Sequence, residues 1–117
     1  MAKRIFTHEQ EVDIFKQYLR IPTVQPVKDE DYKKAGEFLK GIGKKVGLEW
    51  KCLEFKKGRE LVIFTLKGKN SDLKSILLNS HIDVVTVNKE KWERDPFGAE
   101  EDGEGRIYAR GHLPFFF

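Results

Sequence analysis

Residues 75–85, Ser-Ile-Leu-Leu-Asn-Ser-His-Ile-Asp-Val-Val, decide the fold that the sequence predicts. They begin with a short apolar run at residues 76–78, whose side chains do not alternate with polar ones. A strand with one solvated face alternates, whereas a strand covered on both faces is apolar throughout. The run therefore predicts a buried strand over residues 75–80, of the kind that lies in a sheet between layers of helices.

A histidine and an aspartate stand at the carboxyl end of this predicted strand. Ligands of open α/β sheets bind beyond the carboxyl ends of the strands, which is where His81 and Asp83 occur. An imidazole nitrogen is a common zinc ligand, and a neighbouring carboxylate orients such a ligand. The pattern is short, so two interpretations stay open: a metal site, or a strand-end histidine hydrogen-bonded to the aspartate of a turn.

Upstream of this stretch, the sequence predicts two helices followed by a hairpin. A first helix begins behind Thr7, which forms a capping box with Gln10, and ends before Pro22. A second helix begins near the acidic residues 29–31 and ends at Gly47. Alternating side chains over residues 48–55, a turn and a β-rich run over residues 61–66 predict two paired strands.

The apolar stripes of both helices predict core packing. The first stripe consists of Val12, Phe15 and Leu19, and the second of Ala35, Leu39, Ile42 and Val46. Three glycines inside the second helix each cost about 1 kcal/mol relative to alanine. This helix therefore needs tertiary support.

Downstream of the His-x-Asp pair, an acidic segment at residues 100–105 has two interpretations. Its carboxylates are candidate metal ligands, but the pattern Asp-Gly-Glu-Gly favours a turn between two strands. His112 is a further candidate ligand that no neighbouring residue supports, whereas His8 is expected to be exposed on the first helix.

Composition limits the classes of protein to which the chain can belong. Its 117 residues are 39% apolar and 35% charged, and no apolar run reaches the ~20 residues of a membrane span. The 22 basic and 19 acidic residues are interspersed, which is typical of a solvated surface and not of a nucleic-acid-binding stripe. Cys52 is the only cysteine. A single cysteine favours a reducing compartment, so we expect a cytoplasmic protein.

Four separated segments resemble one family, which comprises the aminoacylases, acetylornithine deacetylase and succinyl-diaminopimelate desuccinylase. Residues 15–26 resemble the first-helix segment of the aminoacylases, and residues 75–85 resemble their first metal motif. Residues 92–97 and 105–111 follow in the order and spacing that the family has. The resemblance covers residues 9–111, which is nearly the whole chain.

The resemblance implies an α/β fold, a reaction and a site. Residues 1–111 would be the amino-terminal part of a zinc-peptidase-like catalytic domain, with an incomplete mixed sheet flanked by helices. The implied reaction is zinc-dependent hydrolysis of N-acyl-L-amino acids to a free amino acid and a carboxylate. His81 would be a zinc ligand, and Asp83 would be the catalytic-site carboxylate that positions it. The complete enzyme would be a cytoplasmic homodimer holding two zinc ions per site, with no nucleic-acid or membrane partner.

The last six residues, 112–117, depart from the family and are interpreted as a divergent tail. The family places an aspartate that bridges two zinc ions where this chain has Pro114. We therefore expect this chain to be a truncated and inactive form. The first alternative is a non-catalytic fragment that associates with full-length subunits, and the second is a small self-contained α/β binding module.

Overall fold

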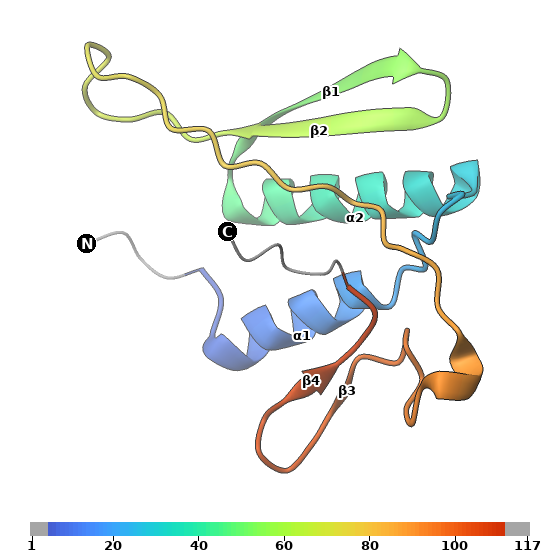
Figure 1. The fold of residues 1–117 in the computed structure, drawn as a ribbon. Helices are drawn as coiled ribbons and strands as arrows, with labels where there is room; N and C mark the ends of the chain where they lie inside the picture. Colours follow the sequence, from blue (N-terminus) through green and yellow to red (C-terminus); the bar gives the residue numbers. More distant parts are fainter. Residues whose placement is uncertain (1–4, 112–117) are drawn as a thin grey trace.

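The structure is a computed structural model that describes residues 5–111. The predictions on His112, Pro114 and the tail lie outside the described residues. Helices and strands follow one another in an α-α-β-β order, with a small hairpin near the carboxyl end (Figure 1). The elements are α1 (His8–Leu19), α2 (Asp29–Val46), β1 (Glu49–Lys56), β2 (Arg59–Thr65), the 3-10 helix η1 (Lys89–Lys91), β3 (Glu100–Glu101) and β4 (Ile107–Tyr108).

Helix α1 begins with the predicted capping box. The Thr7 hydroxyl accepts a hydrogen bond from the Gln10 amide at 3.2 Å, and the Gln10 side chain accepts one from the Thr7 amide at 3.0 Å. The prediction that its stripe forms a core is wrong for Phe15, whose surface is 52% exposed. The helix has no buried residue. It contacts α2 through Tyr18, which stacks on Phe38 with ring centroids 5.8 Å apart.

Helix α2 has the predicted bounds and is supported by the hairpin of β1 and β2. It ends at Gly47, which adopts the left-handed conformation with φ of 72°. The hairpin is antiparallel, as predicted, and lies along one side of α2 (Figure 1). Two of the three glycines in α2, Gly36 and Gly43, are buried against it. A Cβ at Gly43 would lie 3.0 Å from Cδ1 of Phe64 in β2, and nearer still to its Cε1. These glycines therefore permit the close approach of sheet and helix.

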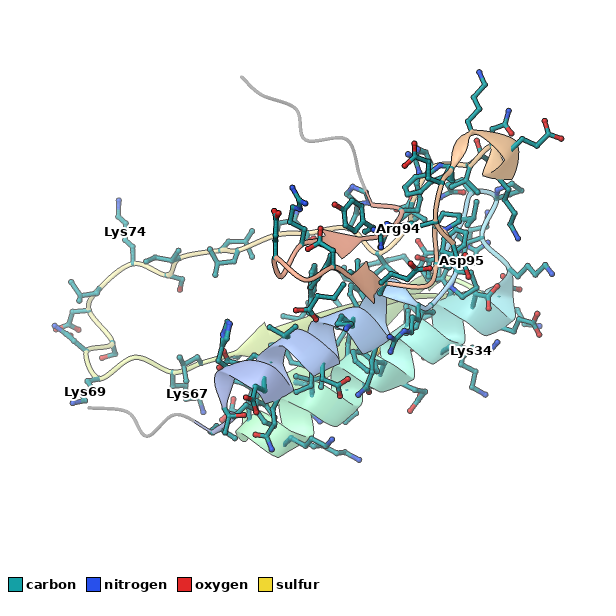
Figure 2. All side chains as sticks on the ribbon, turned by 90° about the horizontal axis from the view of Figure 1, so that it is seen from below. Lys34, Lys67, Lys69, Lys74, Arg94 and Asp95 are labelled. Carbon is teal, nitrogen blue, oxygen red and sulfur yellow. The ribbon has the colours of Figure 1, made fainter. Side chains whose placement is uncertain are left out.

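The predicted buried strand over residues 75–80 is not formed in this structure. Residues 66–80 contain bends and a turn but no strand, and the segment that carries Lys67, Lys69 and Lys74 projects away from the helices (Figure 2). Ile76, Leu77 and Leu78 are between 86% and 90% exposed. A strand exists only through hydrogen bonds to a neighbouring strand, and β1 and β2 pair with each other.

The mixed sheet that the resemblance implies is likewise not formed by the described residues. They form two separate two-stranded antiparallel sheets, β1–β2 and β3–β4. The architecture is consistent with part of an α/β domain. Among the described residues, no helix is long and apolar enough to cross a membrane.

Candidate functional site

The segment with His81 and Asp83 docks on the connection between α1 and α2. Val24 and Val84 form a parallel β-bridge. The Gln25 amide donates to the Val84 carbonyl at 2.9 Å, and the Val84 amide donates to the Thr23 carbonyl at 2.8 Å. The Thr23 hydroxyl adds a hydrogen bond to the Ile82 carbonyl at 2.8 Å. The extended connection between two prolines thus provides a strand edge that holds residues 82–84.

Two arginines link the docked segment and the end of α1 to the carboxyl-terminal part of the chain. The Arg110 side chain donates to the Val85 carbonyl at 3.2 Å, and its amide donates to the Pro96 carbonyl at 2.6 Å. The Arg20 side chain, just after α1, donates to the Gly98 carbonyl at 3.0 Å. The segments that carry the family resemblance are therefore linked to one another in space, although they lie far apart in sequence.

His81 and Asp83 form a side-chain pair on the docked segment. Nδ1 of His81 lies 3.1 Å from Oδ1 of Asp83, and Nε2 of Gln25 donates to Oδ2 of Asp83 at 2.7 Å. The hydrogen bond from Gln25 is the largest cause of a lowered Asp83 pKa, to which His81 also contributes and which partial burial opposes. The His81 side chain is 48% exposed. A carboxylate at Nδ1 favours the proton on that nitrogen and the lone pair on Nε2, which is how zinc-binding histidines are arranged in proteins.

Sequence reasoning paired His81 with Asp83 but did not single out Gln25. The signal available was its position in the extended connection 23–26, which alone indicates no contact with residue 83. The contact joins residues 58 positions apart and depends on the parallel bridge.

The acidic segment at residues 100–105 forms the predicted turn between strands. The Asp102 carboxylate accepts hydrogen bonds from the amides of Glu104 and Arg106, both at 2.9 Å. The Arg106 side chain donates to it at 2.7 Å, and the Tyr108 hydroxyl at 2.9 Å. These contacts, the Arg106 amide first, lower the Asp102 pKa to about 2. Within residues 5–111, no three His, Cys, Asp or Glu side chains gather as a metal site.

A second polar cluster lies between α2 and the hairpin. Nζ of Lys40 is 2.7 Å from Glu60 and 3.0 Å from Glu37, and the Cys52 thiol donates to the same Glu60 oxygen at 3.3 Å. The bond to Glu60 is the main cause of a raised Lys40 pKa. Burial, first, and the contact with Glu60 raise the pKa of the Cys52 thiol. A raised pKa keeps the thiol protonated and unreactive. The contact between Lys40 of α2 and Glu60 of β2 gives the cluster a structural role, because it joins the helix to the hairpin.

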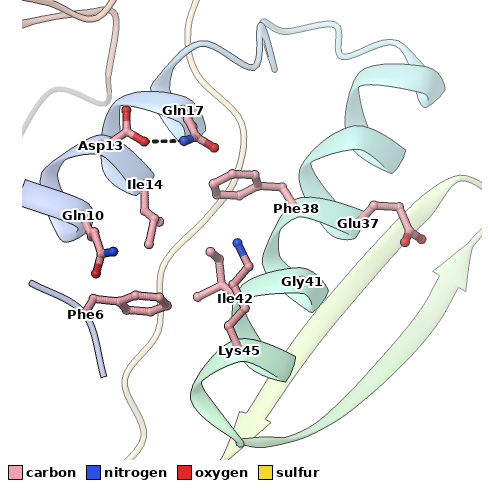
Figure 3. Close-up of a pocket in the computed structure, with 10 residues that line it drawn as sticks. All are labelled: Phe6, Gln10, Asp13, Ile14, Gln17, Glu37, Phe38, Gly41, Ile42 and Lys45. Carbon is pink, nitrogen blue, oxygen red and sulfur yellow. Dashed lines mark hydrogen bonds between the residues drawn. The ribbon is translucent and has the colours of Figure 1, made fainter. Parts of the chain in front are cut away.

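A cavity of about 370 Å³ lies between α1 and α2 (Figure 3). Apolar side chains of Phe6, Ile14, Phe38 and Ile42 face polar ones such as Gln17, which donates to Asp13 at 2.6 Å. The lining contains no residue of the 81–85 segment, so the cavity is separate from the His81–Asp83 pair.

Comparison with known proteins relates the chain to one group of enzymes. It is 50% identical over 100 residues to aminoacylase-1A of Rattus norvegicus and 49% identical over 100 residues to aminoacylase-1 of Homo sapiens. Aminoacylase-1 of Dictyostelium discoideum is 33% identical over 102 residues. These matches cover 86–87% of this chain but 24% of each relative, so the chain spans about a quarter of their length. No protein-family model matches the chain. Over the matched residues, the chain is therefore homologous to aminoacylase-1 of these organisms.

Proposed function

We propose that this chain supplies the first metal-binding segment of a zinc-dependent aminoacylase. In this proposal His81 is a zinc ligand, and Asp83 is the carboxylate that orients it. The observation that carries the proposal is the pairing of His81 Nδ1 with Asp83 Oδ1 at 3.1 Å on a segment docked to the α1–α2 connection. A zinc-binding histidine commonly donates its second nitrogen to such a carboxylate, so the two residues present fit one ligand and its support.

The proposed reaction of the complete protein is hydrolysis of an N-acyl-L-amino acid to a free amino acid and a carboxylate. Bound zinc would supply a water molecule of lowered pKa and polarise the carbonyl oxygen of the substrate. We further propose two zinc ions, a homodimeric assembly and a cytoplasmic location for the complete enzyme. The described residues would then be part of a zinc-peptidase-like catalytic domain. The names of the relatives at about 50% identity support this reaction.

The 117-residue chain is, in the same proposal, inactive by itself. A catalytic zinc site takes three protein ligands and keeps one position for water. The proposal assigns one such ligand to this chain, His81, and position 114 carries a proline, whose side chain has no donor for a metal.

A chimeric enzyme tests the proposed role of His81 in a complete site. Residues 8–111 of this chain replace the corresponding segment of rat aminoacylase-1A, and hydrolysis of N-acetyl-L-amino acids is measured together with zinc content. We expect activity in the chimera, its loss with lower zinc content on His81→Ala, and its retention on His8→Ala, which changes an exposed histidine at the start of α1. Undiminished activity of the His81→Ala chimera would refute the proposal.

The alternative function is a non-catalytic fragment that associates with full-length subunits. The observation in its favour is the exposed apolar run of Ile76, Leu77 and Leu78, which pairs with no strand among residues 5–111. Such an edge favours pairing with another chain. Mixing the 117-residue chain with full-length enzyme and separating the products by size tests this alternative. Co-elution that Leu77→Lys abolishes would support it.

A further inference from the structure

We propose that Gln25 is a positioning residue that fixes the carboxylate of Asp83 and, through it, the ring of His81. The role of His81 as a metal ligand rests on the proposed function, whereas the effect of Gln25 on the ring does not. Gln25 adds a third residue to the His81–Asp83 pair, and it comes from the connection between α1 and α2.

The two oxygens of the Asp83 carboxylate have different partners. Oδ2 accepts from Nε2 of Gln25 at 2.7 Å, and Oδ1 lies 3.1 Å from Nδ1 of His81. The partners come from segments more than fifty positions apart and engage opposite ends of one planar group. Rotation of the carboxylate about its Cβ–Cγ bond would therefore break both contacts. Gln25 thus holds the plane in which Oδ1 faces the imidazole.

The backbone of Gln25 is itself anchored to the segment that it supports. Its amide donates to the Val84 carbonyl at 2.9 Å, and the Val84 amide donates to the Thr23 carbonyl at 2.8 Å. Thr23 is buried, with 4% of its surface exposed, and its hydroxyl donates to the Ile82 carbonyl at 2.8 Å. The main chains on both sides of the Gln25–Asp83 contact are therefore in register, and only side-chain torsions remain to be fixed. A hydrogen bond to a charged group is strong enough to fix them.

The orientation of the carboxylate selects the tautomer of His81. A neutral imidazole carries one proton, and a carboxylate facing Nδ1 keeps the proton on that nitrogen. The lone pair then lies on Nε2. Without Gln25 the carboxylate loses the partner of Oδ2 and turns toward water more readily, so the preference for the Nδ1–H tautomer weakens.

Nitrogen-15 NMR of the metal-free 117-residue chain tests the inference. The ring nitrogens of His81, assigned by comparison with His81→Gln, are observed at pH 8.5 to 9, above the ordinary pKa of an imidazole. Two variants are compared: Gln25→Ala, which removes the side chain, and Gln25→Glu, which keeps its shape but replaces the donor by a second carboxylate. Gln17→Ala is the matched control, because Gln17 donates to Asp13 at 2.6 Å in the same way on α1.

We expect the wild-type ring to be mainly the Nδ1–H tautomer. In both Gln25 variants the ratio of Nδ1–H to Nε2–H should fall, by up to about tenfold, because only part of the energy of a lost hydrogen bond to a charged group reaches the ring. The ratio should not change in Gln17→Ala. The amide signal of Val84 should persist in the variants, because its bond to the Thr23 carbonyl does not involve the Gln25 side chain.

An unchanged tautomer ratio in either folded Gln25 variant would overturn the inference, as would an equal change in Gln17→Ala. Unfolding of both Gln25 variants would overturn it too, because the side chain would then be required for folding and not for orientation. The measurement needs no zinc. If the tautomer ratio of the 117-residue chain falls in the Gln25 variants while the His81→Ala chimera keeps its activity, the proposed function is refuted and the role of Gln25 stands.

Discussion

Replacement of Gly43 by alanine tests how closely the β1–β2 hairpin packs on α2. The new Cβ would lie 3.0 Å from Cδ1 of Phe64 and closer still to its Cε1, so the ring or the strand must move. Gly41 is the matched control. It lies in the same helix, two residues away, and a Cβ there meets no atom within 4 Å.

The two substitutions should change the free energy of unfolding in different directions. Alanine in a helix interior is about 1 kcal/mol more favourable than glycine, and at Gly41 nothing opposes this gain. At Gly43 the same gain is set against the cost of overpacking, which is typically about 1–3 kcal/mol. We therefore expect Gly41→Ala to be about 1 kcal/mol more stable than the wild type. Gly43→Ala should be less stable than Gly41→Ala by about 1–3 kcal/mol.

Urea unfolding followed by far-ultraviolet circular dichroism measures the difference. With a urea dependence of about 1–3 kcal/mol per molar, the midpoints of the two variants should differ by roughly 1 M. Gly36→Ala should fall between them, because its Cβ would lie 2.9 Å from Oε2 of Glu60, the end of a flexible side chain held by Lys40. A Gly43→Ala variant as stable as Gly41→Ala would refute the close packing of Phe64 on α2.

Three further predictions concern the turn, the exposed segment and zinc. Asp102→Asn should speed hydrogen exchange of the Arg106 amide at neutral pH, and this effect should become smaller as the pH is lowered to about 2. A folded-state pKa of about 2 means that the carboxylate stabilises the turn fully above its ordinary pKa and loses this stabilisation as the pH falls through about 2. Equal effects at neutral pH and at about pH 2 would contradict this. The isolated chain should associate in sedimentation experiments, and Leu77→Lys should favour the monomer, because the Leu77 side chain is 86% exposed. A monomeric wild-type chain that binds no hydrophobic dye would exclude this association. After dialysis the chain should retain well under one zinc ion, since our proposal assigns it one ligand, and a tightly held equivalent would show that further ligands are recruited.

The sequence was sufficient to predict elements that depend on neighbouring residues. Thr7 and Gln10 are three positions apart, and the capping box they predict is present. Gly47 ends α2 in the left-handed conformation because glycine has no Cβ to oppose it. Asp102 forms a turn through residues within six positions of it. Such interactions are encoded locally, so a pattern of residue types is enough to find them. The family was also recognisable from its motifs, and the identity to aminoacylase-1 agrees with it.

Tertiary structure decided what depends on distant partners. The apolar run at residues 76–78 has the composition of a buried strand. Strand formation requires a neighbouring strand, however, and no strand among residues 5–111 pairs with this run. The stripe on α1 had helical spacing, yet burial of Phe15 depends on what packs against the helix. Gln25 meets Asp83 only because a parallel bridge joins segments 58 positions apart. The sequence alone therefore determined the helices, the turns and the His81–Asp83 pair, while long-range packing determined which surfaces are covered and which side chain holds that pair in place.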